Sequence, residues 1–165
     1  MVAMTDLNGA RPRRSDVTVR LDDTAKRIIE ILQEDGRASY ATIAKTVGLS
    51  EAAARARVQK LLDAEVMQVV AVTDPTQVGF ARQAMVGIRT EGDLMAVGDR
   101  LAELPEVDYV VTTAGSFDLL VEVVCEDDPH LLAVLRAIRE VEGVVSSETF
   151  VYLKLNKQHY TWGTR

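Results

Sequence analysis

Gly48 separates two short stretches of the chain that have the periodicity of amphipathic helices. The first stretch begins at Ser39, whose hydroxyl can accept a hydrogen bond from a free N–H at a helix start, and Gly48 can end it in the left-handed conformation. Ser50 can cap a second helix over residues 51–63. The segment therefore predicts two helices joined by a tight turn, the arrangement called a helix-turn-helix.

The second of these helices combines an apolar side with exposed positive charge. Its inward positions at helical spacing are Ala54, Val58, Leu61 and Leu62. Small residues near its start would allow a close approach to a DNA groove, and basic side chains suit the phosphates on either side. We therefore predict DNA contacts from Lys45, Ser50, Ala52, Arg55, Arg57, Gln59 and Lys60. The alternative is an ordinary helix pair whose charges only face solvent.

Charge is distributed unevenly along the chain. Residues 1–63 contain 11 Lys and Arg against 9 Asp and Glu, whereas residues 64–165 contain 8 against 16. Because the whole chain has a formal net charge of −6, its positive charge is concentrated in the part that would contact DNA. The asymmetry favours DNA binding over the alternative, and it favours two domains over one.

Residues 21–65 are predicted to form a three-helix domain. Its first helix opens at Asp22 or Asp23, ends near Gly36 and would supply the core behind the helix pair. Residues 1–20 show no periodicity and are expected to be a flexible tail. Four arginines in this tail leave a DNA-contacting arm as the alternative.

The pattern then changes from helical to extended. Residues 66–80 contain a run of β-branched side chains and are expected to form a connecting strand, paired either in the next domain or with a second subunit. Residues 81–155 have the order strand, helix, strand, strand, helix, strand, with strands at 84–90, 107–114, 119–125 and 144–155. This order predicts the ferredoxin-like split β-α-β motif, so the fold class is α+β. Both helices would cover one sheet face, and a second copy would cover the other.

The order and spacing of five segments resemble the Lrp/AsnC (leucine-responsive, "feast/famine") family of transcriptional regulators over residues 21–155. The segments are LDDTAKRIIEILQEDGR at 21–37, GLS at 48–50 with RARVQKL at 55–61, VTDPTQVG at 72–79, AGSFD at 114–118 and GVVSSET at 143–149. The sequence departs from many relatives at Ala52, where they have a serine or threonine, and at Glu65, where they have a glycine. The operator preference of relatives therefore cannot be transferred to this chain.

The resemblance implies a homodimer joined through the C-terminal sheets, often assembled further into tetramers or octamers, that binds a quasi-palindromic operator in double-stranded DNA. It also implies an amino-acid effector held between C-terminal domains. The matching positions are Gly115, Phe117 and Asp118, with Ser147 and Thr149 from a neighbouring chain. A carboxylate can pair with an α-ammonium, and N–H groups and hydroxyls can hold an α-carboxylate. Without the resemblance, Gly115 and Asp118 are ordinary turn residues.

The sequence contains no motif of a catalytic site. It has no glycine-rich phosphate loop, HExxH motif or nucleophile elbow, and its two histidines are far apart. We therefore expect no enzyme activity, cofactor or metal, although the fold alone does not exclude catalysis.

The chain has one cysteine and no apolar run long enough for a membrane span or a signal peptide, so we expect a cytoplasmic protein. The rival hypothesis is a small-molecule-sensing oligomerisation protein with weak or no DNA binding. Residues 156–165 are expected either to pack on a neighbouring subunit or to be disordered.

Overall fold

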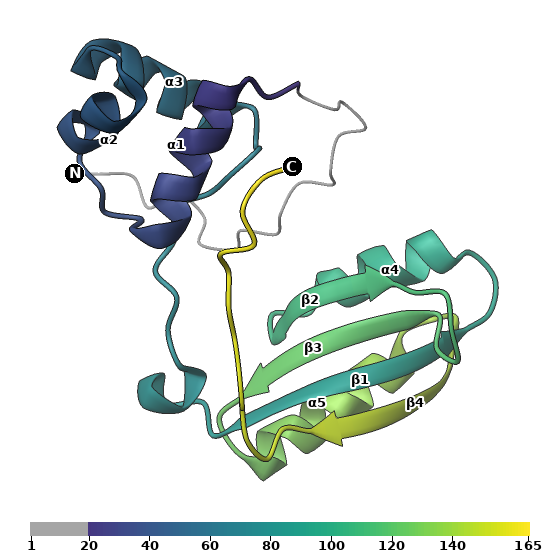
Figure 1. Cartoon of the computed structure of the whole chain (residues 1–165). Helices are drawn as coiled ribbons and strands as arrows, with labels where there is room; N and C mark the ends of the chain where they lie inside the picture. Colours follow the sequence, from purple (N-terminus) through teal and green to yellow (C-terminus); the bar gives the residue numbers. More distant parts are fainter. Residues whose placement is uncertain (1–19) are drawn as a thin grey trace, which may run out of the picture. The chain divides into compact units, whose positions relative to one another are not determined.

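The computed structural model describes residues 20–165, which form two compact units. The helical unit contains residues 20–72 and 156–165, and the sheet unit contains residues 73–155 (Figure 1). The predicted flexible or DNA-contacting tail, apart from Arg20, lies outside the described residues. Residues 156–165, which we expected to be a separate tail, therefore belong to the same unit as the N-terminal helices.

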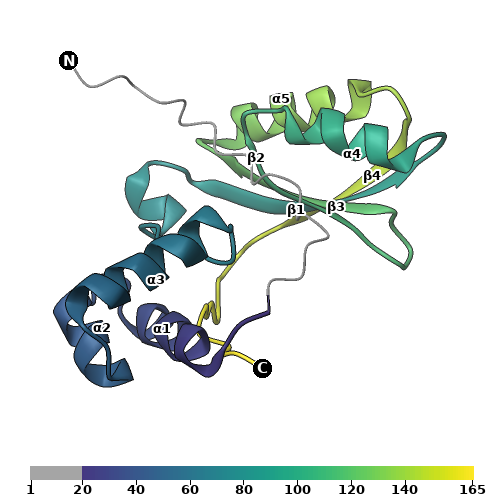
Figure 2. The same cartoon turned by 90° about the horizontal axis from the view of Figure 1, so that it is seen from above.

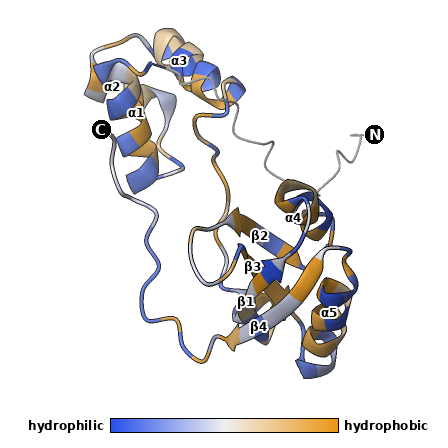
Figure 3. Ribbon diagram, turned by 90° about the vertical axis from the view of Figure 1, so that its right-hand side faces the viewer, coloured by the Kyte–Doolittle hydropathy of each residue, from blue (hydrophilic) through white to orange (hydrophobic). Residues whose placement is uncertain are grey.

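Three helices make up most of the helical unit. They are α1 (Asp23–Glu34), α2 (Tyr40–Val47) and α3 (Glu51–Asp63). Figure 3 shows hydrophobic and hydrophilic residues on different sides of α1, as expected for a helix with one side in a core. The apolar sides of the helices meet in one cluster of buried residues, which are Ala25, Ile28, Ile29, Ile43, Ala44, Ala54, Val58 and Leu61.

A polar side chain caps the start of each of these helices. Asp22, Ser39 and Ser50 each accept a hydrogen bond from the backbone N–H three residues further on, at 2.7 to 3.2 Å. Each such cap stabilises a helix by about 1 kcal/mol. Gly48 ends α2 with a φ of +70°, the left-handed conformation that the sequence predicts for it. Local capping signals therefore define the helix-turn-helix.

The sheet unit has the predicted β-α-β-β-α-β order, and the α+β fold class is confirmed. The sheet order is β2-β3-β1-β4, and all three strand pairs are antiparallel. The elements are β1 (Arg82–Thr90), α4 (Leu94–Ala102), β2 (Val107–Thr112), β3 (Leu119–Cys125), α5 (Asp128–Glu140) and β4 (Val144–Val151). The last strand ends at Val151, whereas the sequence predicted that it would reach Leu155.

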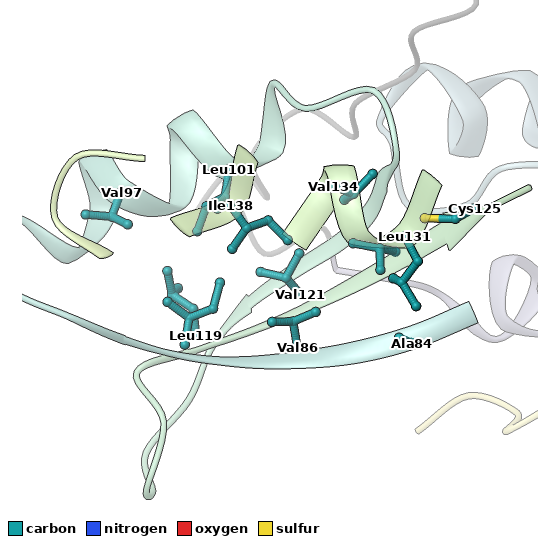
Figure 4. Packing of buried hydrophobic residues seen from close by; sticks show 12 residues of the cluster. Ala84, Val86, Val97, Leu101, Leu119, Val121, Cys125, Leu131, Val134 and Ile138 are labelled. Atoms are coloured by element: carbon teal, nitrogen blue, oxygen red, sulfur yellow. The ribbon is translucent and has the colours of Figure 1, made fainter. Parts of the chain in front are cut away.

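Both helices of the sheet unit lie on the same face of the sheet (Figure 2). Figure 4 shows Leu101 and Ile138, from the two helices, above Val86 and Val121 from the two central strands. All four side chains are completely buried. Neither α4 nor α5 covers the opposite face of the sheet.

The connecting segment differs from its prediction. Residues 67–74 form no strand, and η1 (Pro75–Val78) is a short 3₁₀ helix. Val69, Val70 and Val72 keep 51%, 68% and 60% of their surface exposed. An extended segment needs a neighbour for its N–H and C=O groups, and the sheet contains only β1 to β4. Pairing with the next domain is thus wrong for the described chain, and pairing with a second copy stays a prediction.

Glu65 ends the helix-turn-helix in an unusual backbone conformation. It is the only non-glycine residue among those described that has a positive φ, +54°. The backbone N–H groups of Glu65 and Val66 donate to the carbonyls of Leu62 and Leu61 at 3.0 and 3.1 Å. These bonds satisfy the last carbonyls of α3 in a left-handed turn that glycine adopts more readily. Glu65 therefore adopts the left-handed turn conformation that glycine usually provides.

Candidate nucleic-acid interface and effector site

All seven residues predicted to contact DNA have exposed side chains in the helical unit. They lie on α3, in the turn before it, or at the end of α2. Ala54, Val58 and Leu61 hold α3 in the core, so Ala52, Gln59 and Lys60 lie on its outward side. Sequence periodicity thus correctly predicted which side of α3 faces outward, and contact of that side with DNA stays a prediction.

The residues predicted to contact DNA differ in whether their side chains already have a partner within the chain. Arg55 lies over the ring of Tyr40, with 5.0 Å from its guanidinium carbon to the ring centroid. The Gln59 amide donates to Asp63 Oδ1 at 2.7 Å. Within the described part of the chain, Lys45 and Lys60 make no hydrogen bond or ion pair. These two ammonium groups are free to bind phosphate without first giving up a partner.

Arg57 has a specific partner within the helical unit. Its guanidinium forms an ion pair with the carboxylate of Asp22, the residue that caps α1. This hydrogen bond, followed by the bond from the Ala25 N–H, holds the pKa of Asp22 below its usual value. Arg57 therefore connects α3 to the start of α1, a contact that could not be predicted from the local sequence pattern. Contact of Arg57 with DNA stays a prediction, and it would require sharing or exchanging this partner.

The turn between β2 and β3 contains three of the five predicted effector contacts. Asp118 Oδ2 accepts hydrogen bonds from the backbone N–H of Thr90 at 2.7 Å and from its hydroxyl at 3.4 Å. The backbone N–H of Asp118 donates to the carbonyl of Ile88 at 2.9 Å. Asp118 therefore fastens the turn to the end of β1. Its other carboxylate oxygen accepts no hydrogen bond from the described residues.

Phe117 covers the sheet face that has no helices. Its ring lies over Gly87, where a Cβ atom would come within 2.6 Å of the ring. The ring packs edge-to-face against Phe150, with centroids 6.2 Å apart, and the Arg89 guanidinium lies over it at 5.9 Å. Arg89 Nε also donates to the Ser116 carbonyl at 3.1 Å. Gly87 and Arg89, which the sequence analysis missed, therefore position the turn.

Gly115 has neither of the features that usually require a glycine. Its φ is not in the left-handed region, and nothing lies within 4 Å of the place where its Cβ would be. Any small residue could therefore occupy this position in the single chain. The open space above its backbone is accessible to a ligand.

Ser147 and Thr149 lie on the other face of the sheet from Phe117. They are paired across the β1–β4 ladder with Ile88 and Val86, whose buried side chains face the helices. The hydroxyl of Ser147 accepts a hydrogen bond from Arg139 Nε at 3.1 Å. A surface hollow of about 320 Å³ is lined by Arg139, Val144, Val145, Ser146 and Ser147. One chain does not bring the five predicted residues together.

The remaining reactive side chains have structural contacts. His130 Nε2 lies 3.3 Å from Glu106 Oε1, and its Nδ1 accepts from the Glu126 N–H at 3.3 Å. Cys125 is buried in the sheet core, and burial raises the pKa of its thiol. No group of three or more metal-binding side chains occurs among residues 20–165. None of the helices described is long and apolar enough to cross a membrane.

Known proteins match both units. Residues 21–62 match the AsnC-type helix-turn-helix domain, and residues 83–162 match the Lrp/AsnC ligand binding domain. The HTH-type transcriptional regulator FL11 of Pyrococcus horikoshii is 32% identical over 142 residues, which cover 85% of this chain and 94% of FL11. The structure of Escherichia coli AsnC is similar with a TM-score of 0.74 at 25% identity, covering 86% of this chain and 98% of AsnC.

A further similar structure contains an amino acid. It is a complex of the transcriptional regulator NMB0573 of Neisseria meningitidis with L-Met. The TM-score is again 0.74 at 25% identity, and the match covers 86% of this chain and 96% of that protein.

Proposed function

Because the chain belongs to the Lrp/AsnC family of transcriptional regulators, we propose that it binds specific double-stranded DNA through α3 and that an amino acid or related metabolite modulates this binding. Such a regulator acts where the chromosome lies, in the cytoplasm. The observation that carries DNA binding is the exposed surface of α3 and the turn before it. All seven predicted contacts are exposed there, and Lys45 and Lys60 are unpaired among the described residues.

The assignment of the effector to the turn at 114–118 rests on the chemistry of this turn. One carboxylate oxygen of Asp118 is engaged by Thr90, which orients the group and leaves its second oxygen for an α-ammonium. The backbone at Gly115 is open to a ligand. The complex of NMB0573 with L-Met supports an amino acid as the effector class.

A second copy of the chain would complete the effector site. Ser147 and Thr149 lie on the opposite face from Phe117, so hydroxyls and turn can converge only if they come from different chains. The sheet face without helices exposes Tyr109 at 49% and Phe150 at 45%. Burial of such aromatic side chains is a common source of dimer stability. We therefore assign this face to a homodimer. Because Ser147 and Thr149 face away from it, their hydroxyls would reach the turn of another chain only through the further assembly into tetramers or octamers.

Selection of duplexes from a random-sequence DNA library tests the DNA-binding function. The wild-type protein should enrich quasi-palindromic sequences, and the Lys45→Ala/Lys60→Ala double variant should bind all of them more weakly. A matched control is Lys157→Ala, which removes a positive charge from residues 156–165. Failure of the wild type to enrich any sequence would contradict DNA binding. It would favour the rival function, a small-molecule sensor that assembles without reading DNA.

A further inference from the structure

The segment after β4 returns to the helical unit and binds α1. The backbone N–H of Gly163 donates to Gln33 Oε1 at 3.1 Å, and the Thr164 hydroxyl donates to Glu30 Oε1 at 2.9 Å. Both hydrogen bonds are partly buried and join positions 130 and 134 residues apart. Figure 2 shows this segment, residues 156–165, beside α1. We name it the closing segment.

Three features show that the contact is specific. Glu30 and Gln33 are three residues apart on α1, so they lie on the same side of the helix. Gly163 has a φ of +72°, a conformation that is unfavourable for other residues. The Thr164 hydroxyl, and then Arg27, hold the pKa of Glu30 below its usual value. The closing segment therefore binds two neighbouring side chains of α1, Glu30 and Gln33, through a turn whose conformation favours glycine at position 163.

The helix that receives the closing segment is also connected to the DNA-binding helix. Asp22 caps α1 and forms the ion pair with Arg57 of α3. The two helices also share one hydrophobic core. Anything that fixes α1 therefore fixes the orientation of α3 as well.

The chain thus links the three helices to the sheet unit at two places. One link is the connecting segment, which follows α3 and precedes β1, and the other is the closing segment. A domain on one flexible link samples many positions, whereas a second link closes a loop and removes much of this freedom. Two helix-turn-helix units in a dimer must reach half-sites about one helical turn apart. Units whose positions are restricted by two links therefore lose less conformational entropy on binding DNA than units held by one link.

We propose that the closing segment is a second tether that fixes the separation of the two helix-turn-helix units in a dimer. This inference rests on the proposed function, since it concerns DNA with two half-sites. The tether follows β4, which ends at Val151 and carries Ser147 and Thr149, after the four residues 152–155.

The test removes the contact without changing the DNA-binding surface. The double variant Gln33→Met/Thr164→Val loses the acceptor and the donor but keeps similar side-chain volumes. A second variant, Gly163→Val, weakens docking through the backbone alone. The control is Asn156→Ala, at an exposed position in the same segment. Trp162 is the only tryptophan of the chain, and its fluorescence anisotropy reports whether the segment is docked.

The DNA probes are a duplex selected by the wild type, the same duplex with about half a helical turn inserted between its half-sites, and a single half-site. We expect fast local motion of Trp162 in both docking variants and slow motion in the wild type and control. Binding to the single half-site should stay unchanged. Binding to the intact duplex should weaken by up to roughly thirtyfold, the scale of two net hydrogen bonds, and the penalty for the insertion should shrink.

Three results would overturn the tether. The first is a mobile Trp162 with an unchanged preference for the intact duplex over the inserted one. The second is an equal loss of binding to the single half-site, which would assign the segment to the DNA contact itself. The third is slow motion of Trp162 in both docking variants, which would contradict the hydrogen bonds as the source of docking. If the wild type selects no duplex, the proposed function itself fails, and the tether, which rests on it, fails with it.

Discussion

The helical unit and the sheet unit differ in how much of a functional site one chain can complete. The predicted DNA-binding surface lies within one three-helix unit, where local caps and a small core leave every predicted contact exposed. The predicted effector residues are divided between the two faces of the sheet. A surface formed by consecutive helices can be recognised in one sequence, whereas a site shared between copies is incomplete in one chain.

The largest expected effect tests whether the two units fold independently. Ile43 and Ile88 are completely buried, one in each core. Replacing either with alanine should lower the free energy of unfolding of its unit by about 2–5 kcal/mol. Amide hydrogen exchange should show lost protection in α1, α2 and α3 for Ile43→Ala, with the sheet still protected, and the reverse for Ile88→Ala. Equal loss of protection in both units would show that the helical unit and the sheet unit do not fold independently.

The second prediction separates two roles of Asp118. Asp118→Asn keeps an oxygen that accepts from the Thr90 N–H but removes the charge needed for an α-ammonium. Effector affinity should fall by roughly tenfold to a hundredfold, the scale of a hydrogen bond to a charged group. Effector-free DNA binding should stay unchanged. Calorimetric titration with the effector measures this, with Thr90→Val as the control that removes only a hydroxyl contact.

The third prediction concerns the boundary between the units. Glu65→Gly should raise the free energy of unfolding by about 1–2 kcal/mol, because the left-handed conformation strains a side chain and not glycine. Greater backbone freedom of the unfolded chain would offset part of this gain. Denaturant unfolding measures the change, with Glu65→Ala as the matched control. An unchanged or lower stability of Glu65→Gly would show that the turn is not strained.

The smallest expected effect is on the surface of α3. Lys60 has no partner among the described residues, whereas Arg57 is paired with Asp22. Lys60→Ala should lower the salt dependence of DNA binding by about one unit of slope. Asp22→Asn should keep the cap of α1 but free Arg57, so DNA binding should become stronger. If DNA binding is unchanged in both variants, α3 does not present this surface to DNA.

Sequence periodicity predicted most elements because their signals are local. Capping side chains at positions 22, 39 and 50, and a glycine at 48, lie within a few residues of the helix ends that they define. The outward positions of α3 follow from the same periodicity. Alternation and turn residues predicted the order of the four strands and two helices, although not all of their ends.

Contacts between distant positions could not be predicted in this way. The ion pair of Arg57 with Asp22 joins positions 35 residues apart, and the closing segment meets α1 across at least 130 residues. Neither contact has a periodic signal, because each depends on how the helices and the returning chain pack. The connecting segment was predicted as a strand from its β-branched residues, but propensity does not supply the neighbour that a strand requires.

The most direct test of an amino-acid-responsive regulator is a thermal-unfolding screen of the full chain against the twenty amino acids. A ligand of the folded state stabilises it by ~2.7 kcal/mol at a hundredfold excess over its dissociation constant. We expect one amino acid, or a few related ones, to raise the unfolding temperature of the wild type but not of Asp118→Asn. No shift with any of the twenty, or an equal shift in Asp118→Asn, would contradict an amino-acid site at this turn.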